Sequence, residues 1–277
     1  MMKQFFMTVD VEPDASKGSW NTSDPVTFSG VFDGVERLQA AAKDYGVIVT
    51  YLLQPVVLFS DECSQYFRSL DGCDIGSHLH GEYIGPAARY PGPDFSGCDP
   101  SEQQRDYSVE TERGKMKSLT DLFRNQLGFA PQSLRAGRFG LGDFSLSILS
   151  DMGYLVDSSI VPRWKRFKKI HSTEPFRRDG VIEVPITVSD KCKWLRPTPS
   201  FSSKDDIRSI FTWLDQNNLS TACCMIHNVE LVPGKSPYCH CKSDCNNMMD
   251  RIRFIFDMAQ KYGYKSLGLT NAKLARD

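Results

Sequence analysis

Two short segments of this sequence end in side chains of the kind that bind divalent metal ions. An apolar run at residues 4–9 leads into Asp10 and Glu12, and a second short segment leads into His78 and His80. Carboxylate oxygens and imidazole nitrogens are common ligands of zinc. Because residues i and i+2 of an extended segment point the same way, each pair can aim at one point. The sequence therefore predicts a divalent-metal site.

Three later apolar segments also end in polar side chains. Arg135 and Arg138 come at the end of one, Asp157 ends the next, and His227 follows another. Each alone has a simpler interpretation, such as a solvated turn, a packing histidine or a surface salt bridge. In a parallel barrel, however, all strands end on the same side. We therefore expect these residues to gather around the metal site.

Apolar runs alternate with helical patterns along the whole chain, which predicts a largely parallel sheet. The expected strands are 5–9, 47–53, 74–77, 133–135, 154–157, 181–184, 221–226 and 265–269. The expected helices are 31–45, 107–127, 144–152, 205–216 and 248–262. About seven or eight strand–helix units without a visible domain boundary predict a single α/β domain over residues 1–277, folded as a closed or nearly closed barrel.

Two segments interrupt this alternation. Residues 81–100 are rich in glycine and proline and follow the histidines directly, so we expect a loop at the rim of the site. Residues 163–178 are basic and aromatic, with Trp164, Lys168 and Lys169 among them. This second segment could hold an anionic glycan or a lipid-linked phosphate, or it could be a solvated face.

Composition narrows the class of protein. The net charge of −1 and the lack of a long basic run argue against nucleic acid as a partner. No apolar stretch reaches the length of a membrane span, and the N-terminus does not resemble a secretory signal. Cys223 and Cys224 lie in an apolar run, where buried thiols fit better than disulfides. These features favour a reducing compartment and a cytoplasmic location.

A further group of cysteines has two interpretations. Cys239, His240, Cys241 and Cys245 lie close together in the sequence and could form a structural zinc site. Their spacing lacks the usual Cys-x₂-Cys pairs, so free thiols in a polar loop are the favoured interpretation.

The order of these motifs resembles the NodB-type polysaccharide deacetylases, carbohydrate esterase family four, from about residue 5 to the last strand. The motifs that carry the resemblance are TVDVE at 8–12, IGSHLH at 75–80, RAGR at 135–138, DSS at 157–159 and IH at 226–227. The chain also resembles a bacterial subgroup in which His-x-x-Glu is followed by Pro-Gly and Ser-Pro-Tyr, here at 227–238. The resemblance implies a distorted (β/α)7–8 barrel, a divalent metal, most often Zn²⁺, and hydrolysis of an N-acetyl group from a sugar.

The resemblance also implies roles for single residues. Asp10 matches the catalytic base, and Arg135 matches the arginine that orients it. Asp157 matches an acid that pairs with that arginine, and His227 matches the general acid. In these roles Asp10 would take a proton from water and His227 would protonate the departing amine.

The metal ligands depart from the family pattern. Where most members have adjacent acids, this chain has Asp-Val-Glu, so either Glu12 or Asp10 could touch the metal. Where the family has histidines four residues apart, this chain has His78 and His80, with Glu82 at the fourth position. We expect Glu12, His78 and His80 as ligands, with Glu82 as a substitute candidate.

These expectations define a function. The protein would be a metal-dependent hydrolase that removes an N-acetyl group from an amino sugar in surface polysaccharide or glycan biosynthesis. Its substrate would be a nucleotide-linked sugar, a lipid-linked sugar or a short glycan. The alternatives are hydrolysis of a non-sugar amide, such as deformylation, and a catalytically inactive sugar-binding relative.

Overall fold

The computed structural model describes residues 2–92, 94–167 and 172–274. In these residues the strands form one curled sheet in the order β6-β7-β5-β4-β3-β2-β1-β8, and β9 also pairs with β1. The strands are β1 Gln4–Val11, β2 Val49–Leu53, β3 Asp74–Leu79, β4 Ser133–Ala136, β5 Val156–Asp157, β6 Phe176–Arg178, β7 Val181–Glu183, β8 Thr221–His227 and β9 Lys265–Ser266. Every pairing is parallel except that of β6 with β7.

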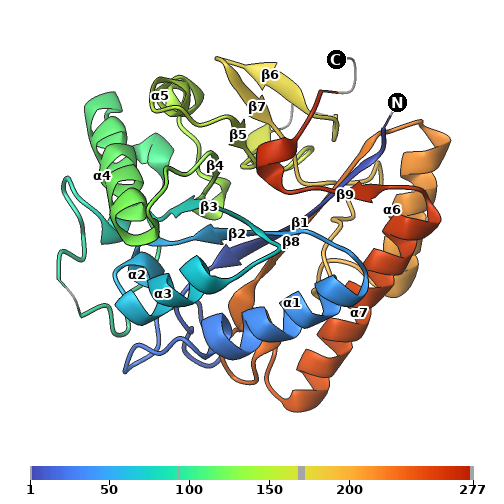
Figure 1. The fold of residues 1–277 in the computed structure, drawn as a ribbon, viewed down its shortest axis with the longest axis horizontal. Coiled ribbons are helices and arrows are strands. Elements are labelled where there is room, and N and C mark those ends of the chain that lie inside the picture. The colour runs from blue at the N-terminus through green and yellow to red at the C-terminus, as the bar shows by residue number, and fades with distance from the viewer. Residues whose placement is uncertain (1, 93, 168–171, 275–277) are drawn as a thin grey trace.

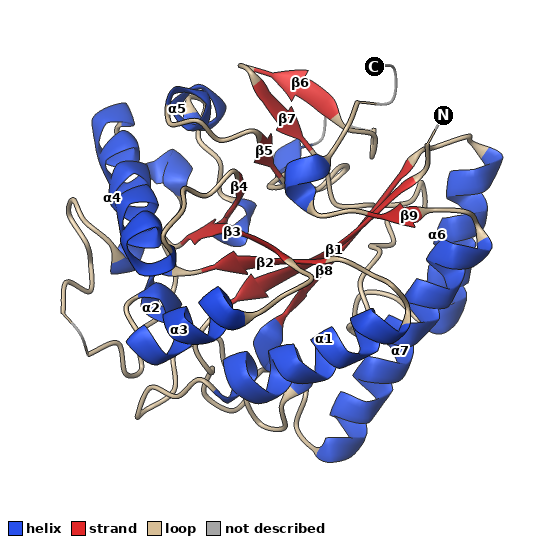
Figure 2. Ribbon diagram, viewed as in Figure 1, coloured by secondary structure: helices blue, strands red, loops and turns tan. Residues whose placement is uncertain are grey.

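Helices surround the outer face of this sheet (Figure 1). The helices are α1 Val35–Asp44, α2 Pro55–Leu58, α3 Asp61–Ser69, α4 Val109–Leu127, α5 Ser145–Asp151, α6 Lys204–Gln216 and α7 Lys242–Lys261. Figure 2 shows the strands in the middle of the molecule and the helices outside them. The predicted fold class is confirmed as a curled, open half-barrel of the α/β type.

Strand periodicity divides the side chains between two cores. Along β1, Phe5, Met7 and Val9 pack in the larger core between sheet and helices, whereas Phe6 packs in a second core on the concave side. Thr8 and Asp10 share the alternation of Phe6, because side chains point to opposite faces in turn. The concave interior therefore receives the polar residues of β1.

Local sequence signals set the helix ends. Ser108 accepts a hydrogen bond from Thr111 N at the start of α4, and Gly128 ends that helix with a left-handed φ of 85°. Ser203 and Asp206 form a reciprocal capping box at the start of α6. These helices cover the convex face and leave the strand ends free to carry polar groups.

All eight expected strands are present, with shifted bounds, and so are the five expected helices. β1 runs to Val11 and β3 to Leu79, so Asp10 and His78 lie within strands instead of after them. The π-helical turn Gly30–Gly34 precedes α1, where a continuous helix was expected. β6, α2 and α3 were not predicted.

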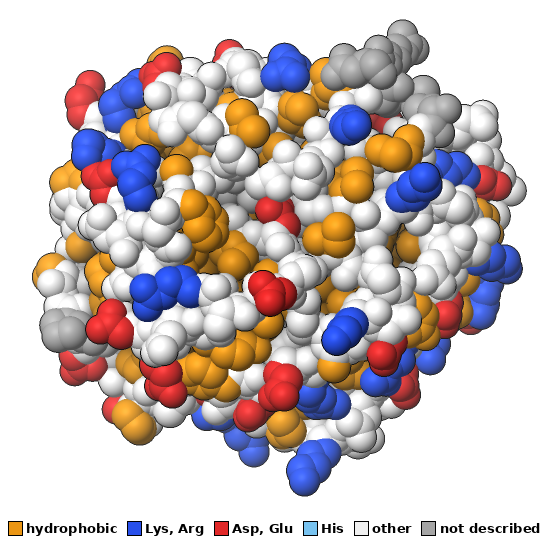
Figure 3. All heavy atoms as spheres, viewed as in Figure 1, with side chains coloured by type: hydrophobic (Ala, Val, Ile, Leu, Met, Phe, Trp, Pro, Cys, Tyr) orange, Lys and Arg blue, Asp and Glu red, His pale blue; other side chains and the backbone are white. Residues whose placement is uncertain are grey.

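Among the described residues, no helix has both the length and the apolar character needed to cross a lipid bilayer. Acidic and basic side chains are intermixed over the face of the molecule seen in Figure 3.

Candidate metal centre

Three side chains from β1 and β3 bring their ligand atoms together. Glu12 Oε1 lies 3.2 Å from His78 Nε2 and 3.1 Å from His80 Nε2, and the two Nε2 atoms are 3.1 Å apart. All three residues are buried. Within the described residues, this is the only group of three or more such side chains close enough to share an ion. The structure thus places together the three side chains that the sequence led us to expect as ligands.

The other nitrogen of each histidine shows where its proton lies. His78 Nδ1 is 2.9 Å from the backbone oxygen of Arg135, and His80 Nδ1 is 3.4 Å from Glu82 Oε1. Both oxygens only accept, so each Nδ1 carries the hydrogen and each Nε2 of a neutral ring presents a lone pair. Two lone pairs and a carboxylate oxygen then face one point, which a cation can occupy.

The dimensions of this triangle fit a divalent ion. Ligands about 2.1 Å from a metal and about 100° apart are separated by about 3.2 Å, close to the three edges observed. Burial alone would lower the pKa of His80, but the Glu82 and Glu12 carboxylates raise it to about 9. Burial raises the pKa of Glu12, and the neighbouring rings of His78 and His80 bring it well below its usual range. The ionised carboxylates of Glu12 and Glu82 thus favour a positive charge between the ligand atoms.

Asn228 fixes the backbone at Glu12. Its Oδ1 accepts a hydrogen bond from Glu12 N, and its Nδ2 donates one to Glu12 O, both at 2.9 Å. The turn before α1 presses directly on this contact, because a Cβ on Gly30 would lie 2.7 Å from Asn228 Nδ2. The close approach needs glycine at this position.

Glu82 lies behind His80 instead of in the ligand triangle. It is fully buried, with Oε1 near His80 Nδ1 and 3.7 Å from Arg138 Nη1. Carboxylates in this position orient a ligand imidazole and fix its tautomer. Lys115 holds the start of the loop in place, since its Nζ donates to the backbone oxygens of Gly81 and Ile84 at 2.6 and 2.9 Å.

Asp10 lies near the end of β1, and one oxygen of its carboxylate is held by an ion pair. Arg135 Nη1 donates to Asp10 Oδ1 at 2.7 Å, and both residues are buried. Burial raises the pKa of Asp10, but the Arg135 guanidinium, with His78 and His227, lowers it below its usual value. Asp10 is therefore ionised at neutral pH and bonded to Arg135 through one oxygen.

The other nitrogens of Arg135 are also occupied. Nε donates to Ser158 O at 2.8 Å, and Nη2 donates to Thr8 Oγ1 and Ser158 Oγ at 2.8 and 3.0 Å. The expected pairing of Arg135 with Asp157 was wrong. Asp157 instead accepts hydrogen bonds from the backbone and hydroxyl of Ser159 and lies opposite Glu183 across β5 and β7.

His227 faces Asp10 from the end of β8. Its Nε2 is 4.0 Å from Asp10 Oδ2, and its Nδ1 donates to Glu230 Oε1 at 2.8 Å. Glu230 also accepts from Arg196 Nη2 and Thr198 Oγ1, each at 2.5 Å. Burial raises the pKa of Glu230, but Arg196 and His227 bring it to about 2. Glu230 therefore stays ionised and holds His227 with Nε2 toward Asp10.

These groups line one cavity of about 530 Å³. Asp10, Glu12, both ligand histidines and His227 all border it, and so do Arg138 and Arg196. Aromatic side chains from several separate segments form much of the remaining wall: Trp20, Phe139, Trp164, Trp194, Phe201 and Tyr238. Pro100, the last residue of the loop 81–100, also borders the cavity.

Sequence reasoning missed part of this wall. Arg196 and Trp20 lie in connecting segments that no motif marked, and Glu230 and Tyr238 appeared only as part of the subgroup motif at 227–238. Of the basic segment 163–178, Trp164 borders the cavity, whereas Lys168 and Lys169 fall outside the described residues.

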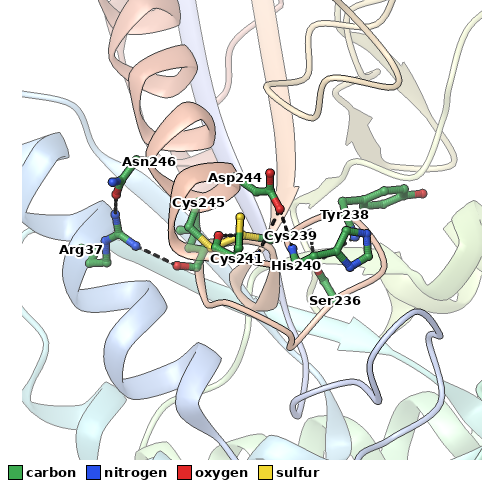
Figure 4. The surroundings of a disulfide bond; sticks show 10 residues. Arg37, Ser236, Tyr238, Cys239, His240, Cys241, Asp244, Cys245 and Asn246 are labelled. Atoms are coloured by element: carbon green, nitrogen blue, oxygen red, sulfur yellow. Dashed lines mark hydrogen bonds between the residues drawn. A yellow bond between two sulfur atoms is a disulfide. The ribbon is translucent and has the colours of Figure 1, made fainter.

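The cysteine group does not form a metal site. Cys239 and Cys245 are joined by a disulfide, while Cys241 between them is free and exposed. Figure 4 shows this disulfide at the start of α7, where Asp244 accepts from the backbone of His240 and Cys241. The helical turn brings Cys245 back beside Cys239, so the expectation of free thiols was wrong for this pair.

No family model and no curated protein matches this sequence, but solved structures resemble its fold. One is a Mycobacterium smegmatis protein provisionally described as a polysaccharide deacetylase, with 16% identity and a TM-score of 0.55 over 98% of this chain and 94% of that chain. The Bc1960 peptidoglycan N-acetylglucosamine deacetylase has 12% identity and a TM-score of 0.54 over 97% and 86%. BA3943, a pseudoenzyme of carbohydrate esterase family four from Bacillus anthracis, has 10% identity and a TM-score of 0.53 over 97% and 64%.

At these identities the likeness establishes the fold. The chain therefore has the fold of the polysaccharide deacetylases of carbohydrate esterase family four, as its motifs predicted. It combines that fold with a buried Glu–His–His cluster at the ends of β1 and β3.

Proposed function

We propose that this protein is a metal-dependent hydrolase that removes an N-acetyl group from an amino sugar. The main support is one arrangement: Asp10 and His227 border the same cavity as the triangle formed by Glu12, His78 and His80. A base, an acid and a cation site are the groups that hydrolysis of an amide needs.

The triangle would hold a divalent ion, with Zn²⁺ as the best match to one carboxylate and two imidazoles. Bound there, the ion supplies Lewis acidity toward an acyl oxygen and a water molecule. Asp10 takes up the proton of the attacking water on Oδ2, since Oδ1 is held by Arg135. Arg135 keeps this carboxylate ionised and correctly oriented.

His227 delivers a proton to the departing amine. Its Nδ1 hydrogen is bonded to Glu230, so Nε2 is the atom that points into the cavity. The Glu230 carboxylate fixes the orientation of the ring during the transfer. The base and the acid thus come from two neighbouring strands, β1 and β8, and face the same cavity.

The aromatic wall supports a sugar as the substrate. Flat aromatic faces pack well against the apolar C–H faces of a pyranose ring, and polar groups at the cavity floor set its orientation. A cavity of about 530 Å³ suits a short glycan or a linked sugar, including a nucleotide- or lipid-linked one.

The test is acetate release from a panel of N-acetylated sugars by the metal-loaded protein, with and without a chelator. Wild type should release acetate, and the chelator should abolish release. Asp10→Asn keeps an acceptor oxygen for Arg135, so it should fold normally while kcat falls by about 10²–10⁴. Unchanged acetate release by this folded variant would refute the role of Asp10.

An inactive sugar-binding relative is the second candidate, because the BA3943 pseudoenzyme shares this fold. That candidate predicts sugar binding without acetate release at any metal loading. A non-sugar amide is the third, and release of acetate or formate only from non-sugar amides would favour it.

A further inference from the structure

Three arginines with very different surroundings are found near the cavity. Arg135 is fully buried and makes four hydrogen bonds to Asp10, Thr8 and Ser158. Arg196 is buried against Glu230 and Thr198 and stacks over Phe201, with its guanidinium carbon 4.3 Å from the ring centre. Both guanidinium groups thus donate hydrogen bonds to other side chains or to the backbone of the protein.

Arg138 is different. It borders the cavity with its side chain 31% exposed, and its buried Nη1 has no hydrogen-bond partner among the described residues. In the described part of the chain its ion-pair partner is Glu82, whose Oε1 is 3.7 Å from Nη1 and already accepts from His80. A guanidinium in this position retains donors for a group that enters from the cavity.

The backbone at this point is also unusual. Arg138 and Phe139 both have φ of 53°, in the left-handed region that side chains other than glycine rarely adopt. The preceding Gly137 packs so closely against His80 that a Cβ there would lie 2.9 Å from its ring. This tight turn presents the Arg138 side chain beside the metal ligands.

An aromatic cluster adjoins Arg138. The rings of Phe139, Trp164 and Trp194 lie 6.0 to 6.2 Å from one another, and all three border the cavity. The cavity wall therefore combines a surface for a sugar ring with a donor-rich cation next to it.

We propose that Arg138 binds an anionic substituent, a carboxylate or a phosphate, on the N-acetylated sugar that this site hydrolyses. This inference rests on the proposed function and specifies its substrate class. The planar guanidinium pairs with either anion through two parallel hydrogen bonds, whereas a neutral sugar leaves its donors to water.

The test compares acetate release from N-acetylglucosamine, N-acetylglucosamine 6-phosphate and N-acetylmuramic acid. In wild type, kcat/KM should be about tenfold or more higher for at least one anionic sugar than for the neutral one. Arg138→Met should bring that ratio close to one, and Arg138→Lys should restore part of it. Arg113→Met removes the same charge from an ion pair on exposed α4, outside the cavity, so it should keep the wild-type ratio.

Binding is measured separately with the inactive Asp10→Asn variant, using the fluorescence of the cavity tryptophans. Equal kcat/KM for all three sugars would overturn the role of Arg138 and leave the deacetylase function standing. A preference for anionic sugars that survives in folded Arg138→Met would also overturn it. Absence of both binding and acetate release for every sugar would refute the proposed function itself. A preference for only the phosphate or only the carboxylate supports the proposal and identifies the anion.

Discussion

The three side chains expected as metal ligands were conspicuous in the sequence, whereas the residues that orient them were not. Glu12, His78 and His80 could be predicted because period-two spacing at a strand end aims two side chains at one point. Asn228 and Glu82 act through hydrogen bonds to these ligands, and neither contact follows from sequence spacing. Glu82 was expected as a substitute ligand and instead supports His80.

The position of Glu82 leads to a prediction about metal affinity. Glu82→Gln keeps the shape and an acceptor but removes the charge that polarises His80 Nδ1–H. We expect the metal dissociation constant to rise by about 10- to 100-fold, measured by competition with a chromogenic chelator. Glu110→Gln, on the exposed first turn of α4, should leave it unchanged. Equal affinities for the two variants would show that Glu82 does not tune the site.

The partner of Arg135 illustrates the limit of motif matching. The motifs predicted Arg135 close to both Asp10 and Asp157. In the structure it forms an ion pair with Asp10 and not with Asp157. The choice depends on which face of β4 the side chain occupies and on how far the sheet curls. Neither can be read from one strand.

At the level of elements, β5 and β7 bring Asp157 and Glu183 side by side in parallel register. Both are fully buried, and burial raises the pKa of each, that of Glu183 to well above its usual range, with the Asp157 charge adding to the effect. The pair therefore binds a shared proton more tightly in the folded protein than a solvent-exposed carboxyl group would. The larger upward shift in pKa is that of Glu183.

This shared proton makes stability depend on pH. A raised folded-state pKa favours the folded protein below the unfolded pKa of about 4.3, and this contribution is lost as pH rises through the folded value. Glu183→Gln imitates the protonated acid, so the variant should gain stability relative to wild type as pH rises from 5 to 8. The gain should be about 1.4 kcal/mol for each pH unit that lies between the unfolded-state and folded-state pKa values. Urea unfolding at several pH values measures this difference. Glu36→Gln, on the exposed side of α1, is the control, and parallel pH curves for Glu183→Gln and wild type would contradict the assignment.

Most elements followed from periodicity, and the exceptions have physical reasons. α2 has only four residues, too few to show a helical repeat, and β6 has three residues inside a basic aromatic segment. The long helices α4, α6 and α7 combined an apolar face with clear end signals. Where the apolar repeat extended over several helical turns, the predicted helix is present.

At the level of the whole molecule, the cysteines give a direct check of the structure. The chain has nine cysteines, and seven are free because Cys239 and Cys245 are bonded. Thiol titration of protein isolated without reductant, then denatured, should count seven, rising to nine after reduction. Peptide mapping should link Cys239 to Cys245. A count of nine before reduction would contradict this disulfide.

The sheet remains open between β6 and β8 in the described residues, so connecting segments and not strands close the cavity. The groups proposed to react stand at the ends of strands, whereas Trp20, Trp194 and Tyr238 stand on those connections. Substitutions in the connections can therefore change the aromatic wall without moving the polar groups at the strand ends. Relatives built on such a scaffold would differ in the sugars they accept while keeping the same arrangement of polar groups.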